Sequence, residues 1–184
     1  MISVIGIGTA ASKIAEKFKS QSNYDVYRLC GNCENSKNSF NLKTFEEPEE
    51  YEKNIPNLKS FFKDVKEDVQ VFITGSSYSS NYALGILEQI KDKKIEVFYV
   101  KPDTELLTGV PKLIENAVYG VLQEYARSGL LKSLTIFSNT ELEKSLSDIS
   151  IKNYFDMINQ AIFSSVHYTN FFKYTDPEIG QISK

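Results

Sequence analysis

Short runs of apolar and β-branched residues recur along this chain and end at polar or glycine-containing segments. Runs of this length and composition are typical of strands that are buried on both faces of a parallel sheet. The segment 24–29 shows alternation instead, which also indicates a strand. The pattern predicts strands at residues 2–7, 24–29, 69–74, 95–100 and 132–137.

Between these runs, apolar residues recur at the three- and four-residue spacing of amphipathic helices. The spacing is clearest in Ala83, Leu84, Ile86, Leu87 and Ile90. Pro in a first turn and Gly just past a last turn are typical of helix ends, and Pro111 and Gly129 bound one segment in this way. The pattern predicts helices at 10–20, 57–66, 79–92, 110–128 and 153–172, with a polar loop at 31–41 and a solvated acidic segment at 42–56.

Strands that alternate with helices indicate a parallel sheet covered on both faces. We therefore expect an α/β fold, a three-layer Rossmann-like parallel sheet with helices on both faces. No internal repeat or flexible linker interrupts the series, so residues 1–184 are expected to form a single domain.

Composition excludes several classes of protein. The content of 41% hydrophobic and 24% charged residues is ordinary for a globular domain. A formal net charge of −3 argues against a nucleic-acid partner, which usually selects a basic surface. No run of about 18 apolar residues predicts a membrane span, and the first residues do not resemble a secretory signal. We expect a cytoplasmic location.

The two cysteines, Cys30 and Cys33, form a Cys-Gly-Asn-Cys motif. One interpretation is a thioredoxin-type redox pair; the other is two thiols in a loop. A redox pair should open a helix, but the following residues are polar and loop-like. A zinc site needs about four ligands, and the single histidine, His167, lies far along the chain. The pattern favours two thiols in a loop.

Two strands end at glycine and lead directly into helices. Gly6 and Gly8 end the first, and Gly75 ends the third, before a Ser-Ser-Tyr-Ser-Ser-Asn segment. Loops at the carboxyl edge of a parallel sheet bind ligands, and helix N-termini there suit phosphate. The alternative for the glycines is a tight turn. For Ser79, Ser80 and Asn81 we favour the alternative of helix N-caps.

The order and the sequences of these segments resemble those of the N-terminal nucleotide-binding domain of the FtsZ/tubulin family. Val4-Ile5-Gly6-Ile7-Gly8 resembles its first phosphate loop, and the segment Val71–Ala83 lies where that family has its glycine-rich signature loop. Further matches are Asn32-Cys33-Glu34, Val100-Lys101-Pro102 with Gly109, Ala117 and Gly120, Ile136–Leu142, and Tyr154–Gln160.

The resemblance implies a candidate nucleotide site for GTP or GDP with Mg²⁺, in which Glu34 would orient the metal through water. It implies no direct protein ligand to the metal. The corresponding positions are Gly6, Gly8, Thr9, Lys13, Asn32, Glu34, Gly75, Ser76, Ser77, Ser79, Ser80, Asn81, Asn139, Asn159 and Gln160.

Departures from the family pattern concern the loops that would hold phosphate. The signature loop keeps only Gly75, and serine and Tyr78 follow where glycines should let backbone N–H groups approach an anion. Lys13 replaces the asparagine that reads guanine, Gln160 replaces the acid that faces the base, and the segment from Asp176 to Lys184 lacks the acidic motif of the family's GTPase site. The second domain of the family is absent from this sequence.

The sequence therefore predicts a degenerate FtsZ/tubulin-like domain that self-associates or binds a protein partner, and no GTPase activity. One alternative is a nucleotide-binding protein with altered base recognition. Another is a sugar-phosphate-binding α/β domain, because a Gly-Ser-Ser-Tyr-Ser-Ser loop resembles those of sugar isomerase domains. It ranks third, because such domains have a second Ser/Thr-rich loop after the next strand. Here that strand ends in Lys101-Pro102-Asp103-Thr104, where Thr104 is the only Ser or Thr.

Overall fold

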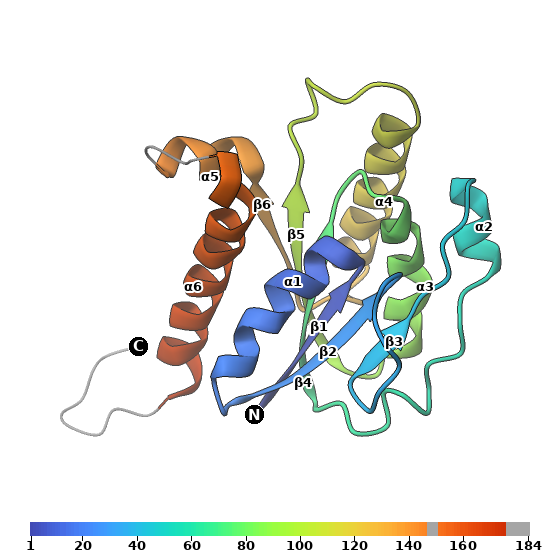
Figure 1. Ribbon diagram of the computed structural model, residues 1–184. Coiled ribbons are helices and arrows are strands. Elements are labelled where there is room, and N and C mark those ends of the chain that lie inside the picture. The colour runs from blue at the N-terminus through green and yellow to red at the C-terminus, as the bar shows by residue number, and fades with distance from the viewer. Residues whose placement is uncertain (147–150, 176–184) are drawn as a thin grey trace.

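A computed structural model describes residues 1–146 and 151–175 of the chain. Within these residues, six parallel strands form one sheet in the order β3-β2-β1-β4-β5-β6 (Figure 1). The predicted α/β class with a parallel sheet is confirmed. The strands are β1 (Ile2–Ile7), β2 (Tyr24–Cys30), β3 (Ser39–Asn41), β4 (Asp68–Thr74), β5 (Lys94–Lys101) and β6 (Ser133–Ser138).

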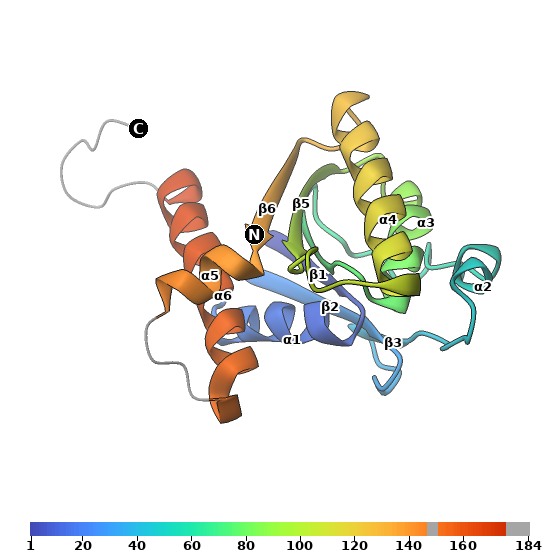
Figure 2. The ribbon, with the colours of Figure 1, turned by 90° about the horizontal axis from the view of Figure 1, so that it is seen from above.

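Helices cover both faces of this sheet, as seen from above in Figure 2. On one face lie α2 (Pro48–Lys53), α3 (Tyr82–Gln89) and α4 (Gly109–Arg127). On the other lie α1 (Thr9–Lys17), α5 (Asn139–Ser145) and α6 (Tyr154–Tyr174). Short 3₁₀ turns are η1 (Phe18–Ser20), η2 (Tyr78–Asn81) and η3 (Ile151–Asn153). Among the described residues, no helix is both long and apolar enough to cross a membrane.

Each face of the sheet carries its own apolar core. On the α3–α4 face, side chains from β4 and β5 pack against Tyr82, Ile86 and Val118. On the α1–α6 face, Phe18 is fully buried and stacks edge-on against Phe163 of α6. Burial on both sides explains why the central strands are almost continuously apolar.

The segment 57–66, predicted as a helix, is a series of turns, so that prediction is wrong. Leu58, Phe62 and Val65 are buried as the spacing indicated. The backbone, however, makes only isolated turn bonds, such as Phe62 N–H to Leu58 O at 2.9 Å and Val65 N–H to Phe62 O at 3.0 Å. Helical spacing here reports which side chains are buried, not the backbone conformation.

Three further elements differ from the sequence prediction. Strand β3 lies inside the predicted loop at 31–41, and α2 lies inside the predicted acidic segment. Helix α5 follows β6 without having been predicted. All three are short, at three to seven residues, and too short to show a hydrophobic period.

A buried polar network fixes α6 against the sheet. Asn170 of α6 exchanges hydrogen bonds with Gln70 of β4, at 2.7 and 2.8 Å, and donates to the Tyr24 hydroxyl at 3.2 Å. Gln70 also donates to Glu96 of β5, whose carboxylate accepts from Lys173. Burial opposes ionisation of Glu96, but these hydrogen bonds outweigh it and lower its pKa. The network therefore joins the last described helix to two central strands.

Candidate functional site

The first predicted phosphate loop connects β1 to α1. Gly8 is the N-cap of α1 and has φ +91°, a left-handed conformation that favours glycine. Its N–H donates to Leu29 O at 2.7 Å, and its carbonyl accepts from the Ser12 N–H at 2.9 Å. The Thr9 hydroxyl reaches Asn32 in the loop after β2, at 3.4 Å. The structure thus brings Gly8, Thr9 and Asn32 together at the carboxyl edge of the sheet.

Gly6 serves packing inside the sheet. It lies within β1, and a Cβ at this position would lie 2.6 Å from the Ser12 Cα and 2.7 Å from the Ala11 carbonyl oxygen. The Ser12 hydroxyl also donates to the Gly6 carbonyl at 3.1 Å. The close approach of α1 to β1 accounts for this glycine without a ligand.

The second loop begins at Gly75, where β4 ends. A Cβ on Gly75 would overlap the Oε2 of Glu115, and it would lie 2.5 Å from the Tyr99 hydroxyl and 2.7 Å from Pro102 Cδ. Glycine is therefore required here because side chains of β5 and α4 occupy the space directly beside the loop.

Glu115 is a buried carboxylate beside this loop, and sequence analysis did not identify it. Only 2% of the residue is exposed. The Tyr99 hydroxyl donates to Oε2 at 2.6 Å, while Oε1 has no hydrogen-bond partner among the described residues. Burial raises the pKa of Glu115, against the opposing effects of the Tyr99 hydrogen bond, the Lys101 charge and the Ser76 amide. The Ser76 N–H faces the carboxylate but does not complete a hydrogen bond to Oε1.

A signal for Glu115 exists in the sequence. Ile114, Val118 and Leu122 are the buried residues of α4, and Glu115 precedes the last two by three and seven positions, which places it on the same helix face. A lone acid on an apolar face indicates a buried charge that needs a partner.

The serine segment after Gly75 is bonded to itself. Ser76 adopts φ +57°, which is uncommon outside glycine. The Ser77 and Ser79 hydroxyls lie 3.2 Å apart, Ser80 donates to Ser77 O at 2.6 Å, and Asn81 donates to Tyr78 O at 2.9 Å. The helix-cap interpretation holds only for the position of Asn81, which is the N-cap residue of α3 but makes no side-chain cap bond; Ser79 and Ser80 lie within η2. A tight 3₁₀ turn instead uses these polar groups internally.

The two loops close on one another. The Ser79 hydroxyl lies directly against Gly8, where a Cβ would overlap it. Two adjoining surface hollows, of about 400 and 370 Å³, lie away from the two loops, and both are lined by Tyr27, Lys37 and Asp64. Neither hollow is lined by a predicted site residue. The Ser79 side chain therefore packs directly against the first loop at Gly8.

The other predicted site residues do not join this cluster. Lys13 and Glu34 are exposed. Asn139 begins α5, with its Oδ1 buried and unpartnered within the described chain. Asn159 lies on α6 beside Gln160, which donates to Ser164 at 3.3 Å. In residues 1–146 and 151–175, no hydrogen bond connects any of them to the two loops.

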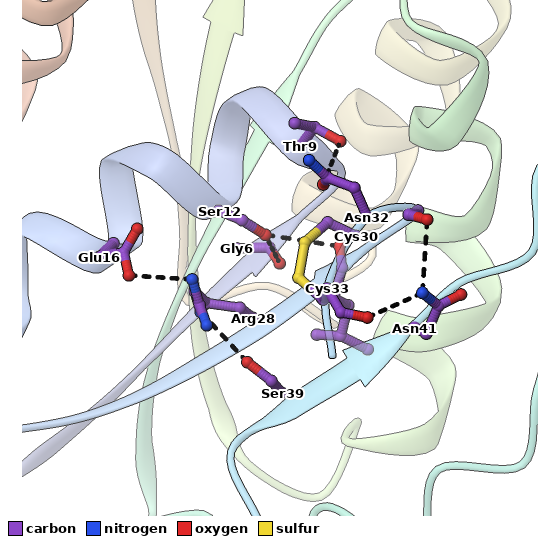
Figure 3. The surroundings of a disulfide bond; sticks show 12 residues. Gly6, Thr9, Ser12, Glu16, Arg28, Cys30, Asn32, Cys33, Ser39 and Asn41 are labelled. Carbon is purple, nitrogen blue, oxygen red and sulfur yellow. Dashed lines mark hydrogen bonds and ion pairs between the residues drawn. A yellow bond between two sulfur atoms is a disulfide. The ribbon is translucent and has the colours of Figure 1, made fainter. Parts of the chain in front are cut away.

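A disulfide joins Cys30, the last residue of β2, to Cys33 in the loop that follows (Figure 3). The two thiols expected in a loop are therefore bonded, with Cα atoms 5.3 Å apart, and both residues are buried. No helix follows them, which distinguishes the motif from a thioredoxin-type site. The Asn41 side chain donates to the Cys33 carbonyl at 2.7 Å and fixes the loop next to Asn32. The sequence spacing allowed this bond but did not establish it.

Both loop glycines lie directly against side chains of the protein: a Cβ on Gly8 would overlap the Ser79 hydroxyl, and one on Gly75 would overlap the Glu115 carboxylate. No cluster of three or more His, Cys, Asp or Glu residues that could hold a metal ion occurs in the part of the chain that the structure describes. The segment from Asp176 to Lys184 lies outside the described residues.

Comparisons with known proteins identify the fold. A scan of protein-family models gives no match, and neither does a search of curated protein sequences. A structure described as an empty FtsZ dimer from M. jannaschii matches with a TM-score of 0.76 at 12% identity, over 97% of this chain and 57% of that chain. A C-terminal deletion mutant of Thermoplasma acidophilum aldohexose dehydrogenase matches with a TM-score of 0.43 at 15% identity, over 90% and 79% of the two chains, which is too low to guide interpretation.

The chain has an FtsZ/tubulin-like fold, as the sequence resemblance indicated. At 12% identity the likeness concerns the fold alone. The chain spans 57% of the length of the FtsZ chain that it matches.

Proposed function

We propose that this chain is a degenerate FtsZ/tubulin-like protein that assembles or binds a protein partner, and that it does not hydrolyse GTP. The observation that carries the proposal is the Glu115 carboxylate beside Gly75. Its Oε2 occupies the place of a Cβ on Gly75, so the loop packs against a buried acidic side chain.

Electrostatics support an empty loop. A buried acidic side chain beside the loop disfavours a second negative charge there, and burial raises the pKa of Glu115. A phosphate cradle relies instead on glycines that bring backbone N–H groups to the anion. Here the Ser76 amide instead acts on the Glu115 carboxylate and lowers its pKa against the effect of burial.

Loss of hydrolysis follows from the same geometry. Catalysis of phosphoryl transfer depends on donors positioned for the transition state, and loss of one such donor costs about 10²–10³ in rate. The Ser77 and Ser79 hydroxyls bond to each other, and the Ser80 hydroxyl donates to Ser77 O. They are not oriented toward a common ligand.

Exposed aromatic side chains support a role in protein association. On α6, Phe155 is 76% exposed, Phe171 is 52% exposed and Phe172 is 66% exposed. Phe171 and Phe172 are in contact with each other near the end of this helix, and exposed apolar side chains that lie together mark interaction surfaces.

The test combines an activity and an assembly measurement. Phosphate release is measured with Mg²⁺ and GTP over a range of protein concentrations, and the molar mass is measured by size-exclusion chromatography with light scattering, with and without GTP. We expect background phosphate release and a mass that GTP does not change. Saturable turnover that rises more steeply than linearly with protein concentration, or a strict monomer that binds GTP tightly, would contradict the proposal.

A further inference from the structure

The two adjoining hollows lie at the β3 end of the sheet. The larger has a volume of about 400 Å³, and small-molecule sites are clefts of about 300–1,000 Å³. Its wall consists of parts of β2 and β3, the loop before β3 and the turn segment 57–66. None of the predicted phosphate-loop residues lines it. The larger hollow is therefore a candidate binding site separate from the loops.

Aromatic rings form part of the wall of the larger hollow. Tyr27, Phe40 and Phe61 all line it. The Phe61 ring meets the other two rings edge-on, with its centroid 5.7 Å from that of Tyr27 and 5.8 Å from that of Phe40. Phe40 and Phe61 are only partly buried, so they still present surface to a ligand. Such a wall favours a ligand with a flat apolar body.

Tyr27 brings an unbonded hydroxyl to this place. The residue is only 2% exposed, and it lines both hollows. Its hydroxyl makes no hydrogen bond to any residue that the structure describes. Burial, together with the charges of Asp25 and Asp64, raises its pKa, so the hydroxyl stays protonated at neutral pH and can donate. Buried hydroxyl groups usually have a partner, and a ligand in the hollow would supply one.

The charges at the two hollows leave one lysine without a partner. Three lysines and two aspartates line them, namely Lys37, Lys63, Lys66, Asp25 and Asp64. Lys37 pairs with Asp64 at 3.4 Å, and Lys66 pairs with Asp25 at 3.5 Å. Lys63 forms no ion pair within residues 1–146 and 151–175. The charge that remains unpaired at the larger hollow is therefore positive, which favours an anionic ligand.

Other polar groups at the larger hollow can also donate. Ser36 and Ser60 line it, and neither hydroxyl is hydrogen-bonded to the described part of the chain. Asn35 uses its Oδ1 to accept from the Asn41 N–H at 2.7 Å, which leaves its amide N–H groups to donate. Together with Lys63, these donors match the acceptor oxygens of a carboxylate.

The edge strand beside the hollow is closed to an extended peptide. β3 has only three residues. Its Ser39 carbonyl accepts from the Ser36 N–H at 2.8 Å, and its Asn41 N–H donates to the Asn35 side chain at 2.7 Å. Strand addition needs such edge groups to be free. A compact molecule therefore suits this place better than an added strand.

We propose that the larger hollow binds a free small organic acid with an aromatic body, with its ring against Phe40 and Phe61 and its carboxylate at Lys63. The Tyr27 hydroxyl donates a further hydrogen bond to this ligand. The site goes beyond the proposed function, and it does not depend on the state of the phosphate loops.

NMR titration of the full ¹⁵N-labelled chain with phenylacetate and indole-3-acetate tests the site. Phenylacetamide is the matched neutral probe, because it keeps the ring of phenylacetate and loses the charge. We expect saturable shifts of the backbone amides of 36–40 and 60–64 at millimolar acid. Phenylacetamide should bind about tenfold more weakly than phenylacetate, as expected for loss of a hydrogen bond between charged groups. The absence of saturable shifts in these segments with both acids, or equal affinity for the acid and the amide, overturns the proposal.

Two variants connect binding to the named side chains. Lys63→Gln should weaken binding of the acid about tenfold. Lys59→Gln is the matched control, because Lys59 is exposed in the same segment but lines neither hollow, and it should leave the affinity unchanged. Tyr27→Phe keeps the ring and removes only the unbonded hydroxyl, so it should weaken binding about fivefold without lowering Tm. Unchanged affinity in Lys63→Gln or Tyr27→Phe, or an equal loss in Lys59→Gln, overturns the proposal, and none of these results bears on GTP hydrolysis.

Discussion

Replacement of Gly75 by alanine tests whether this glycine serves the protein's own packing. An added methyl group would overlap Glu115 Oε2 and would lie 2.5 Å from the Tyr99 hydroxyl. To make room, the hydrogen bond between Tyr99 and Glu115 must open, although both groups are buried. A glycine kept for an external phosphate would have free space beside it instead, and its replacement would leave the unliganded protein almost unchanged.

The expected cost follows from two contributions. Overpacking of a tightly packed site costs about 1–3 kcal/mol, and loss of a hydrogen bond to a buried charged group costs about 1.5–3 kcal/mol. The two overlap, because movement of Tyr99 relieves part of the overpacking. We expect about 3 kcal/mol of lost unfolding free energy. For a chain of this size, that lowers Tm by about 6–12 °C.

Thermal and urea unfolding measure this effect, with Gly120→Ala as the matched control. A Cβ on Gly120 meets nothing within 4 Å, and alanine favours a helix over glycine by about 1 kcal/mol. The same substitution should therefore stabilise at Gly120 and destabilise at Gly75. Both variants are compared with the wild type at one protein concentration, because association alters Tm. A Gly75→Ala protein within about 0.5 kcal/mol of the wild type would refute the reasoning.

Two further predictions concern groups outside the loops. Glu96 has a pKa below its ordinary value of 4.5 in the folded protein, so its contribution to stability is present above pH 4.5 and is lost as the pH falls through the lower folded pKa. The difference in unfolding free energy between the wild type and Glu96→Gln, measured by urea unfolding, should therefore shrink on acidification. A difference that stays constant with pH would contradict this. Reduction of the Cys30–Cys33 disulfide should lower the free energy of unfolding by about 2 kcal/mol, because this disulfide closes only a short loop. Thermal unfolding with and without dithiothreitol measures the effect, and Cys30→Ser is the control that dithiothreitol should not change. A wild type with the same Tm in both conditions would contradict this prediction.

The central strands could be predicted from the sequence because burial on both faces leaves an almost continuous apolar run. The segment predicted as 69–74 is β4, Asp68–Thr74, with Val69 to Ile73 buried. The segment 57–66 shows the limit of the same reasoning. Its apolar residues are buried at helical spacing, but the backbone forms turns, since periodicity records only which side chains face the core.

The place of the two glycine loops at the carboxyl edge of the sheet could also be predicted, since glycine at a strand end indicates such a loop. The contents of these loops could not. Whether Gly75 borders a ligand or Glu115 depends on how α4 packs against β5, forty residues downstream of the loop. Likewise, Ser79 fills the space beside Gly8 through a contact between segments far apart in the sequence. Such side-chain contacts arise from tertiary packing and leave no local pattern.

Thermal unfolding with Mg²⁺ and GTP tests the central claim, that the phosphate loops are closed by the protein's own side chains, most directly. A ligand at a hundredfold excess over its Kd stabilises a protein by about 2.7 kcal/mol, which would raise Tm by about 5–11 °C here. We expect no change in Tm from micromolar to millimolar GTP or GDP. A saturable rise in Tm that Mg²⁺ enhances would contradict the account, because it would show that the loops open to admit a nucleotide.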